Sequence, residues 1–536
     1  MSSFASAVQS GNEECGRGST DGIAVQNGDS IQYVIHISID GLRPDAVTTL
    51  GPLNVPHFYR LRIEGAYTDN ARTDYDFTNT LPNHTCMLTG RPVNGPEGHN
   101  VDFNSDTVDT IEDAHGSYVA GVFDVLHDRG FGTAIYASKS KFALFDRSWN
   151  EVNGAPDTVG ADNGRDKIDR YVYDSNTSTL TDTFLADMAS GLYTYSFVHY
   201  RDPDATGHSY GWNSPEYYDV VIAIDGYLGS IFYLVENDPV FLNKTAIILI
   251  SDHGGHGTGH SDPTLPANYT IPCYVWGPGI PAGADLYWLN PASRLDPGGG
   301  RPDYSAEPQP IRNGGTSNLA LGLLGLVAIP GSSIDDLQDL DVFPPGGVGD
   351  LPVVFIVNPE DDATFQPLDT VTFEASASTA MGAIEKVEFF ANWNKLGDDA
   401  TLPYTFTWNG LPLGSFTITA RAVRDDSIAA VSNISIVVFD PATDAAEIET
   451  SRIQYRLYPN PLSTTARIDF SMVRSGRAGL VLYDVSGRRI RTLPLGWREQ
   501  GRHSVHVNAS GLPPGLYFFR LHLGGRIETG KCMIVR

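Results

Sequence analysis

Short apolar runs alternate with longer amphipathic segments over the first 340 residues of this 536-residue chain. Continuous apolar runs are typical of strands buried on both faces, and segments with helical periodicity are typical of helices. Strands that alternate with helices predict an α/β layered domain. The apolar runs are 33–39, 133–137, 196–199 and 245–250, and the helical segments are 57–64, 82–89, 117–129, 214–236 and 317–326.

Acidic and histidine side chains follow three of these strands. Asp40, Asp204 and Asp252 come at or just beyond the strand ends, and His208 and His253 accompany them. Because ligands in open α/β sheets bind beyond the carboxyl ends of the strands, we expect these groups to converge. Carboxylates and imidazoles in this mixture suit Zn²⁺ or a similar divalent ion, and two such ions stabilise both ends of a phosphoryl displacement. The sequence therefore predicts a two-metal site for phosphate-ester chemistry.

Thr80 is the candidate nucleophile of this site. It precedes Pro82, a residue that favours a helix start, so we expect Thr80 at a helix N-terminus, where free N–H groups favour an anion. A threonine hydroxyl is a poor nucleophile until a metal or a base lowers its pKa, and direct coordination by one ion of a pair does so. A threonine that only caps the helix is the alternative interpretation.

Two β-rich regions follow the α/β domain. A Pro-Pro-Gly-Gly stretch at 344–347 is typical of a linker, and beyond it the segments become short and alternate apolar with polar residues. This spacing predicts an immunoglobulin-like β-sandwich and then a second all-β unit. The predicted parts are an N-terminal tail at 1–30, the α/β domain at 31–340, the Ig-like domain at 351–440 and the last β-sandwich at 453–536.

Composition excludes several classes of partner. The formal charge of −28 argues against binding of nucleic-acid duplexes, which requires a cationic surface. No apolar run of about 18 residues occurs, so we expect no membrane span. The first residues lack a basic start followed by an apolar stretch, so no signal peptide is visible. The four cysteines are scattered and show no C-x-x-C spacing, so we expect no cysteine zinc site.

Four motifs resemble the alkaline phosphatase superfamily, and within it the type I phosphodiesterase/nucleotide pyrophosphatase family. The resemblance covers about residues 31–340. The motifs are Asp40-Gly41-Leu42-Arg43-Pro44-Asp45, Thr80-Leu81-Pro82-Asn83-His84, Asp202-Pro203-Asp204-Ala205-Thr206-Gly207-His208 and Ser251-Asp252-His253-Gly254. The resemblance implies two zinc ions. One would be held by Asp40, Thr80, Asp252 and His253, and the other by Asp204, His208 and a third histidine.

The third histidine is His256 or His260, because the next histidine in the chain is His503, in the terminal β unit. The spacing resembles the short loop of glycosyl-phosphatidylinositol ethanolamine-phosphate transferases, which favours His260. His256 would then support a ligand from outside the metal shell. The family resemblance also implies that Asn104, together with the backbone N–H of Thr80, holds phosphoryl oxygens.

The substrate class stays open between diesters and monoesters. Three aspartates and a threonine alkoxide balance two zinc ions, which suits a singly charged diester. Lys139 and Lys141 resemble the Lys-x-Arg of threonine-dependent periplasmic alkaline phosphatases, and would supply the extra positive charge that a monoester needs. Leu81 stands where nucleotide pyrophosphatases often have an aromatic residue. Thr80 and His84 stand where a sulfatase needs Cys or Ser and then Arg, so a sulfatase is not expected.

The last part of the chain resembles a type IX secretion C-terminal sorting domain. The resemblance rests on Tyr458-Pro459-Asn460-Pro461, Leu482-Tyr483-Asp484-Val485-Ser486-Gly487-Arg488 and Leu512-Pro513-Pro514-Gly515-Leu516-Tyr517. It implies that secretion machinery is a partner and that the protein is secreted or on a bacterial cell surface. We therefore predict a secreted two-zinc phosphodiesterase that acts on a small phosphate ester through a phosphothreonine intermediate. An alkaline phosphatase and a non-enzymatic surface adhesin are the alternatives.

Overall fold

The computed structural model describes residues 31–190, 193–344, 347, 351–425 and 427–438, and from residue 456 onward the strands of a further β domain and a few residues between them. The predicted N-terminal tail at 1–30 and a polar segment at 441–452 lie outside the described residues. Cys86, Cys273 and Cys532, three of the four cysteines, are described, and each is free and buried.

An eight-stranded sheet forms the centre of the first domain, with the strand order β4-β3-β5-β1-β6-β7-β2-β8. Its strands are β1 (Tyr33–Ile39), β2 (Ala66–Arg72), β3 (Thr133–Ala137), β4 (Arg170–Tyr173), β5 (Tyr195–Tyr200), β6 (Thr245–Ile250), β7 (Thr270–Trp276) and β8 (Ala284–Asp285). Strands β5, β1 and β6 are adjacent and parallel. Their carboxyl ends therefore lie at one edge of the sheet, as the sequence predicts.

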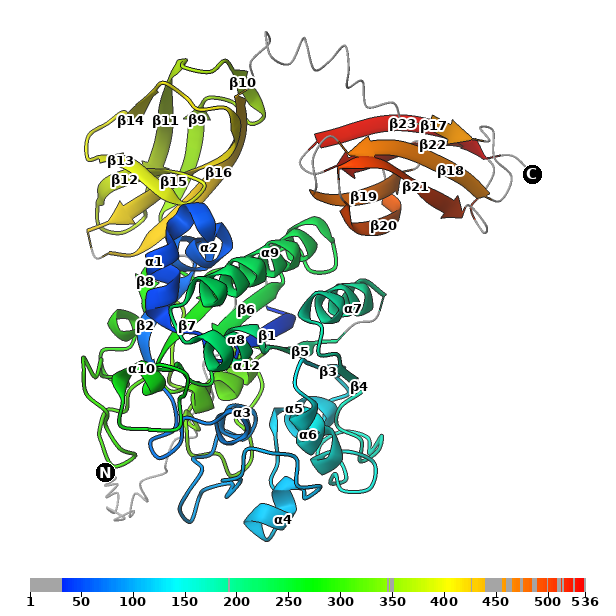
Figure 1. The fold of residues 1–536 in the computed structure, drawn as a ribbon. Coiled ribbons are helices and arrows are strands. Elements are labelled where there is room, and N and C mark those ends of the chain that lie inside the picture. The colour runs from blue at the N-terminus through cyan, green and yellow to red at the C-terminus, as the bar shows by residue number, and fades with distance from the viewer. Residues whose placement is uncertain are drawn as a thin grey trace, which may run out of the picture.

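Helices cover both faces of this sheet (Figure 1). They are α1 (Pro44–Asn54), α2 (Pro56–Glu64), α3 (Thr80–Thr89), α4 (Ile111–His115), α5 (Val122–His127), α6 (Ala143–Ser148), α7 (Thr177–Ser190), α8 (Asp202–Tyr210), α9 (Pro215–Asn237), α10 (Pro266–Tyr269), α11 (Leu286–Leu289) and α12 (Thr316–Leu323). One apolar core lies between the sheet and α3, α5 and α12, and a second lies between the sheet and α1, α2, α7 and α9. The predicted α/β class is confirmed.

One predicted helix is shorter than expected. The sequence predicts a helix over 117–129, whereas α5 begins at Val122. The backbone N–H of Gly121 donates to the Asp124 carboxylate at 2.8 Å, which caps the helix at this point. Gly121 also lies flat against the ring of Trp149, where an added Cβ would come within 2.5 Å of the indole.

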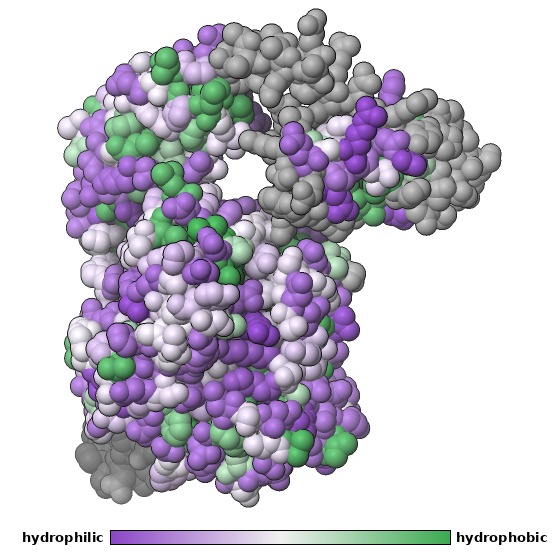
Figure 2. Space-filling model, viewed as in Figure 1, coloured by the Kyte–Doolittle hydropathy of each residue, from purple (hydrophilic) through white to green (hydrophobic). Residues whose placement is uncertain are grey.

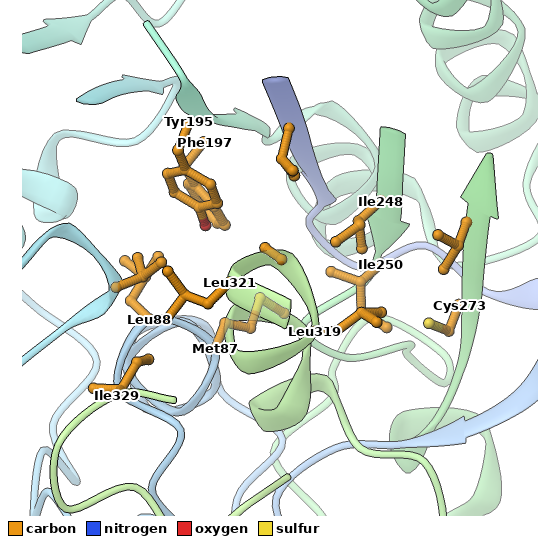
Figure 3. Packing of buried hydrophobic residues seen from close by; sticks show 14 of the residues in the cluster. Met87, Leu88, Tyr195, Phe197, Ile248, Ile250, Cys273, Leu319, Leu321 and Ile329 are labelled. Atoms are coloured by element: carbon orange, nitrogen blue, oxygen red, sulfur yellow. The ribbon is translucent and has the colours of Figure 1, made fainter. Parts of the chain in front are cut away.

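Helix α3 is fixed to the sheet by its apolar side. Met87 and Leu88 point into the core beside Leu319 and Leu321 of α12 (Figure 3). All ten residues of α3 are buried, including Thr80 at its first position. The predicted helix start is therefore two residues too late, and Thr80 begins the helix.

Helix α9 is the one described helix that is long and apolar enough to cross a membrane by composition alone. Its buried residues Val221, Ile224, Leu228 and Ile231 pack into the second core of the α/β domain. This packing is that of a core helix in a globular domain.

The Ig-like region forms two sheets, with the orders β14-β11-β9 and β10-β16-β15-β12-β13. Its strands are β9 (Val353–Asn358), β10 (Ala363–Phe365), β11 (Thr370–Ser378), β12 (Ile384–Ala391), β13 (Asn394–Asp399), β14 (Tyr404–Asn409), β15 (Gly414–Arg424) and β16 (Ala429–Val438). It contacts the α/β domain directly. Ile63 at the end of α2 shares an apolar cluster with Phe390 and Trp393. The N–H of Ala282 donates to the carbonyl of Ala429 at 2.8 Å.

The last domain also forms two sheets, with the orders β17-β18-β21 and β20-β19-β22-β23. Its strands are β17 (Arg456–Tyr458), β18 (Thr465–Met472), β19 (Gly476–Tyr483), β20 (Arg489–Arg498), β21 (Gly501–Asn508), β22 (Gly515–Leu523) and β23 (Arg526–Ile534). An apolar core lies between the two sheets and includes Ile468, Phe470, Phe519 and Leu521. The predicted succession of an α/β domain and β-rich domains is confirmed.

Candidate metal centre

The ends of β1 and β5 are tied together by backbone contacts around two aspartates. The Asp40 N–H donates to the carbonyl of Tyr200 at 2.9 Å, and the Asp204 N–H donates to the carbonyl of Asp40 at 3.0 Å. Gly41 has a φ of 75°, which favours glycine, and an added Cβ would lie 3.0 Å from the Asp204 Cα. The glycine thus allows the chain after β1 to turn beneath α8.

Thr80 is held by contacts on both sides of its helix turn. His84 donates from Nδ1 to the Thr80 carbonyl at 2.8 Å, and its Nε2 accepts from the Ser38 hydroxyl of β1 at 2.8 Å. The Asn104 side-chain carbonyl accepts the Leu81 N–H at 3.0 Å. These bonds fix the start of α3 relative to β1.

Asp204, His208 and His260 form the outer ligand group. The Nε2 atoms of His208 and His260 lie 3.3 and 3.5 Å from Asp204 Oδ1 and 3.1 Å from each other. His208 donates from Nδ1 to the Thr258 carbonyl at 2.9 Å, and His260 donates from Nδ1 to the Thr78 carbonyl at 2.5 Å. Both histidines therefore present Nε2 to the aspartate. The structure brings His260 to this group, whereas His256 is exposed.

Asp40, Asp252 and His253 form the inner ligand group, and all three side chains are fully buried. The His253 Nε2 lies 3.5 Å from Asp40 Oδ1, 3.2 Å from Asp252 Oδ2 and 4.0 Å from Asp204 Oδ1. His253 donates from Nδ1 to the Gly254 carbonyl at 2.8 Å. Asp204 lies between the inner and outer groups, so one carboxylate borders both.

Four of these buried ligand atoms have no hydrogen-bond partner. They are Asp40 Oδ1, Asp204 Oδ1, Asp252 Oδ2 and His253 Nε2. An unpaired buried polar atom costs about 1–3 kcal/mol, so four in one place require compensation. Oxygen and imidazole nitrogen atoms grouped within a few ångströms of one another are the donors that bind a divalent ion of the zinc type. The residues present therefore fit a metal centre.

The charges of the buried groups support the same conclusion. Burial lowers the pKa of His253 to about 3, so its imidazole is neutral. Burial and the nearby Asp40 charge raise the pKa of Asp252 well above its usual value. Burial alone would raise the pKa of Asp40, but Lys139 and the neighbouring histidines lower it well below the ordinary value. The protein groups thus supply too little positive charge for three buried carboxylates, and divalent cations would supply the rest.

Two lysines and an asparagine lie around the first turn of α3. The Lys139 ammonium lies 2.6 Å from both Asp40 Oδ2 and Asp204 Oδ2, and 3.3 Å from Thr80 Oγ1. The Lys141 ammonium donates to the Asn104 side-chain carbonyl at 2.9 Å. That carbonyl also accepts the Leu81 N–H, so both contacts use the oxygen of the Asn104 amide and neither uses its nitrogen.

His199 of β5 is a site residue that the sequence analysis did not identify. Its Nε2 donates to Asp40 Oδ2 at 2.9 Å, and its Nδ1 accepts from the Ser138 N–H at 3.3 Å. Its ring packs against Phe142 with centroids 4.2 Å apart. The contact holds Asp40 so that Oδ1 faces His253. The signal in the sequence is a histidine inside a mostly apolar strand. Its contact with Asp40 depends on the pairing of β5 with β1.

Trp212 forms one wall of the outer ligand group. Its ring lies edge-on to that of His260, with centroids 6.0 Å apart, and its indole N–H donates to the Gly41 carbonyl at 2.9 Å. An added Cβ at Gly207 or Gly255 would come within 2.6 or 2.0 Å of this ring. Gly207 and Gly255 therefore make room for the tryptophan that packs on the histidine.

Three family models match the chain in succession. Residues 34–101 and 116–266 match the type I phosphodiesterase/nucleotide pyrophosphatase family. The match runs from β1 to the start of α10, so the α/β domain is similar to this family over most of its length. Residues 352–432 match a bacterial Ig domain, and residues 456–536 match a secretion system C-terminal sorting domain. The sorting domain indicates a secreted or cell-surface protein and implies secretion machinery as a partner.

Curated relatives share parts of the α/β domain. The GPI ethanolamine phosphate transferase 1 of Saccharomyces cerevisiae is 29% identical over 176 residues, which are 31% of this chain and 16% of that protein. The human ectonucleotide pyrophosphatase/phosphodiesterase family member 1 is 30% identical over 224 residues, which are 40% of this chain and 23% of that protein. The chain thus spans less than a quarter of the length of these two relatives.

The solved structure of murine ectonucleotide pyrophosphatase/phosphodiesterase 5 is similar to this chain at 16% identity and a TM-score of 0.40, covering 58% of this chain and 100% of that one.

Proposed function

We propose that this protein is a secreted phosphodiesterase that binds two divalent metal ions, with zinc as the best fit, and forms a phosphothreonine intermediate on Thr80. The observation that carries the proposal is the group of four unpaired buried ligand atoms next to Thr80. Lys139 contacts the Thr80 hydroxyl and the Oδ2 atoms of Asp40 and Asp204, whose Oδ1 atoms belong to this group. The family match of the α/β domain supports phosphate-ester chemistry for the same residues. The inner and outer ligand groups would each hold one ion.

When bound, the metal ions lower the pKa of a coordinated hydroxyl or water and stabilise the charge of the phosphoryl oxygens. Thr80 loses its hydroxyl proton to water and attacks phosphorus in line. The Thr80 Oγ1–P bond forms, the bond from phosphorus to the ester oxygen breaks, and the leaving oxygen takes a proton from water. Water then cleaves the phosphothreonine and restores Thr80. His84 and Asn104 hold the first turn of α3, so the hydroxyl keeps its place through both steps.

Lys139 acts as a fixed positive charge and not as the base that activates Thr80. Burial alone would lower its pKa, but Asp40 and Asp204 raise it above the ordinary value for lysine. The ammonium therefore keeps its proton while it lies 3.3 Å from Thr80 Oγ1. There it stabilises negative charge on the hydroxyl oxygen or on a bound phosphate.

A phosphomonoesterase is the second candidate function, and the position of Lys139 favours it. A buried ammonium next to Thr80 adds one positive charge to the balance of three carboxylates and two divalent ions. The extra charge suits a dianionic monoester better than a site without it. Lys141 reaches the start of α3 through Asn104, because its ammonium donates to the Asn104 side-chain carbonyl.

Rates on the mono- and bis-esters of one phenol decide between these functions. For the zinc-loaded protein we expect a higher kcat/KM on bis(p-nitrophenyl) phosphate than on p-nitrophenyl phosphate. Thr80→Ala should lower both rates by about 10³-fold or more, because it removes the nucleophile. Thr183→Ala, on an exposed turn of α7, is the matched control and should leave both rates unchanged.

Lys139→Ala separates the two activities further. If Lys139 serves monoester binding, the variant loses monoester activity by at least tenfold more than diester activity. A faster reaction on the monoester in the parent protein would establish the phosphomonoesterase. Inactivity of the metal-loaded protein on both esters would exclude both enzymes and support the adhesin.

A further inference from the structure

A cavity of about 920 Å³ lies in the α/β domain outside the metal centre. Its walls come from three parts of the chain, 92–97, 292–315 and 333–340. No residue of the inner or outer ligand group lines it. A volume of this size is typical of pockets that hold an organic ligand, and it is far larger than a single ion needs. The cavity is therefore a candidate site for an organic molecule.

The walls of the cavity combine apolar surface with an excess of negative charge. Ile334, Leu340 and four prolines supply the apolar part. Five carboxylates and two guanidinium groups also line the cavity, which gives the lining a formal charge of −3. On the side that Figure 2 shows, the surface of the α/β domain is mostly hydrophilic, with single apolar side chains between. A ligand that matches these walls has an apolar body and a positive charge.

The two arginines of the lining already donate to groups of the protein. Arg294 donates to Asp335 Oδ1 at 2.5 Å and lies 2.8 Å from Asp339 Oδ1. Arg312 uses all three of its guanidinium nitrogens on oxygen atoms of the protein. One guanidinium is thus shared between two carboxylates and cannot neutralise both. Negative charge stays in excess at this wall of the cavity.

Asp335 is the group that points to a ligand. Its side chain is only 3% exposed, and its Oδ2 has no hydrogen-bond partner. Its Oδ1 accepts the Leu340 N–H at 3.1 Å, and the neighbouring Asp339 carboxylate is itself an acceptor. Burial raises the pKa of Asp335 to about 7, although Arg294 opposes the rise, and Asp339 adds to it. A buried carboxylate oxygen without a donor is costly, and a donor that enters with a ligand removes that cost.

A metal ion suits this position less well than an ammonium group. Ca²⁺ takes about six to eight oxygen ligands, and zinc takes about four ligands. Among the described residues, groups of three or more possible metal ligands occur only around Asp204. At the cavity, two carboxylates already share one arginine. An ammonium group requires one charged acceptor and brings its own N–H donors.

We propose that this cavity binds an organic ammonium compound, with the ammonium group on Asp335 Oδ2 and the apolar body against the proline walls. The contact is a charge-assisted hydrogen bond, which is stronger than a neutral one. It supplies the donor that Oδ2 lacks and offsets the negative charge that Arg294 leaves uncompensated. Asp336 also lines the cavity, but it is exposed, so solvent screens its charge.

A ligand-observed NMR titration of the zinc-loaded full chain tests this inference. The probe is the 2-phenylethylammonium ion at about pH 8, where the amine keeps its proton and Asp335 has mostly lost its own. Its neutral isostere, 2-phenylethanol, is the control. We expect a Kd of about 1 mM or below for the amine, and binding about tenfold weaker or less for the alcohol. Equal affinity for the two compounds, or a Kd above about 10 mM for the amine, overturns the proposal.

Asp335→Asn shows whether this carboxylate carries the binding. Asparagine has the same shape and tolerates the left-handed backbone of this position, where φ is 56°. Its carbonyl can accept from Arg294 and Leu340, but its amide then presents a donor in place of Oδ2. We expect the affinity for the amine to fall about tenfold or more, while that for the alcohol stays the same. Asp336→Asn is the matched control and should change the Kd less than about threefold.

Unchanged binding of the amine by Asp335→Asn would place it elsewhere on the protein, the metal centre included, and would refute the proposal. An equal loss in Asp336→Asn would do the same. Thermal melting by circular dichroism shows whether Asp335→Asn folds. If it does not, diffraction from crystals of the parent protein soaked with the amine decides. The ammonium nitrogen is expected about 3 Å from Asp335 Oδ2, and an empty cavity overturns the proposal.

Discussion

Trp393→Phe should weaken the docking of the Ig-like domain on the α/β domain. The Glu64 carboxylate lies at the interface with its side chain only 4% exposed. Within its own domain it accepts from Arg60 Nε at 2.8 Å and from the Trp276 indole at 3.2 Å. From the Ig-like domain it accepts from the Trp393 indole at 3.0 Å and from the Asn433 amide at 2.9 Å. One buried carboxylate thus joins the two domains.

The magnitude follows from the kind of bond that is lost. Phenylalanine keeps an aromatic ring against Ile63 and Phe390 but removes the N–H that donates to Glu64. A hydrogen bond to a charged group contributes about 1.5–3 kcal/mol, and its loss leaves Asn433 as the donor from the Ig-like domain to Glu64. We therefore expect the variant to weaken the docking of the two domains by about 2 kcal/mol. Trp393→Ala should cost about 3–5 kcal/mol, because it also empties the apolar contact.

Differential scanning calorimetry of the full chain measures this effect. The parent protein should unfold the α/β and Ig-like domains in one shared transition. Trp393→Phe should lower its midpoint by several degrees, and Trp393→Ala should split it in two. Trp288→Phe is the matched control, because Trp288 is 41% exposed in the α/β domain and lies outside the shared cluster. A single unchanged transition in both Trp393 variants would refute the docking argument.

Three further predictions concern the site and the Ig-like core. Burial alone would raise the pKa of Glu388 from its ordinary value of 4.5, but neighbouring cations lower it to about 2. Stability from this group is therefore present above pH 4.5 and lost as the pH falls towards 2. Glu388→Gln should remove about 1–2 kcal/mol of this loss in the free energy of unfolding, which is measured as a flatter decline of the melting midpoint over the same window. His199→Gln should weaken zinc binding about tenfold or more in a chelator competition, because Asp40 Oδ2 loses the histidine and keeps Lys139 alone; an unchanged affinity would show that the histidine does not position the ligand. Gly41→Ala should lower both the melting temperature and the zinc content, since its φ of 75° and its 3.0 Å approach to Asp204 leave no room for a Cβ; retention of both would contradict that geometry.

Local sequence patterns predict much of the fold and of the site. A strand buried on both faces is apolar throughout, so β1 and β6 stand out in the sequence with correct ends. Asp40 follows β1 directly and Asp252 follows β6 after one residue, and parallel neighbours place the strand ends together. The third histidine ligand can be narrowed down to His256 or His260, because the next histidine in the chain is His503.

Other features depend on contacts between segments far apart in the sequence. His199 supports Asp40 only because β5 pairs with β1, and the sequence does not determine that strand order. The contact of Lys139 with two aspartates arises in the same way, from the position of β3 beside β5. The docking of Trp393 on Glu64 depends on the fit of two domain surfaces, for which no local pattern exists. The predicted helix over 117–129 includes Gly121, whose packing against a distant ring is equally invisible.

The central claim is that two metal ions bind within a few ångströms of Thr80. X-ray diffraction from crystals of the zinc-loaded protein, recorded at the zinc absorption edge, tests it most directly. We predict two anomalous peaks. One lies among the atoms of the inner ligand group and the other among those of the outer ligand group, on either side of Asp204. No peak at this edge of the sheet, or zinc bound only elsewhere on the protein, would contradict the claim.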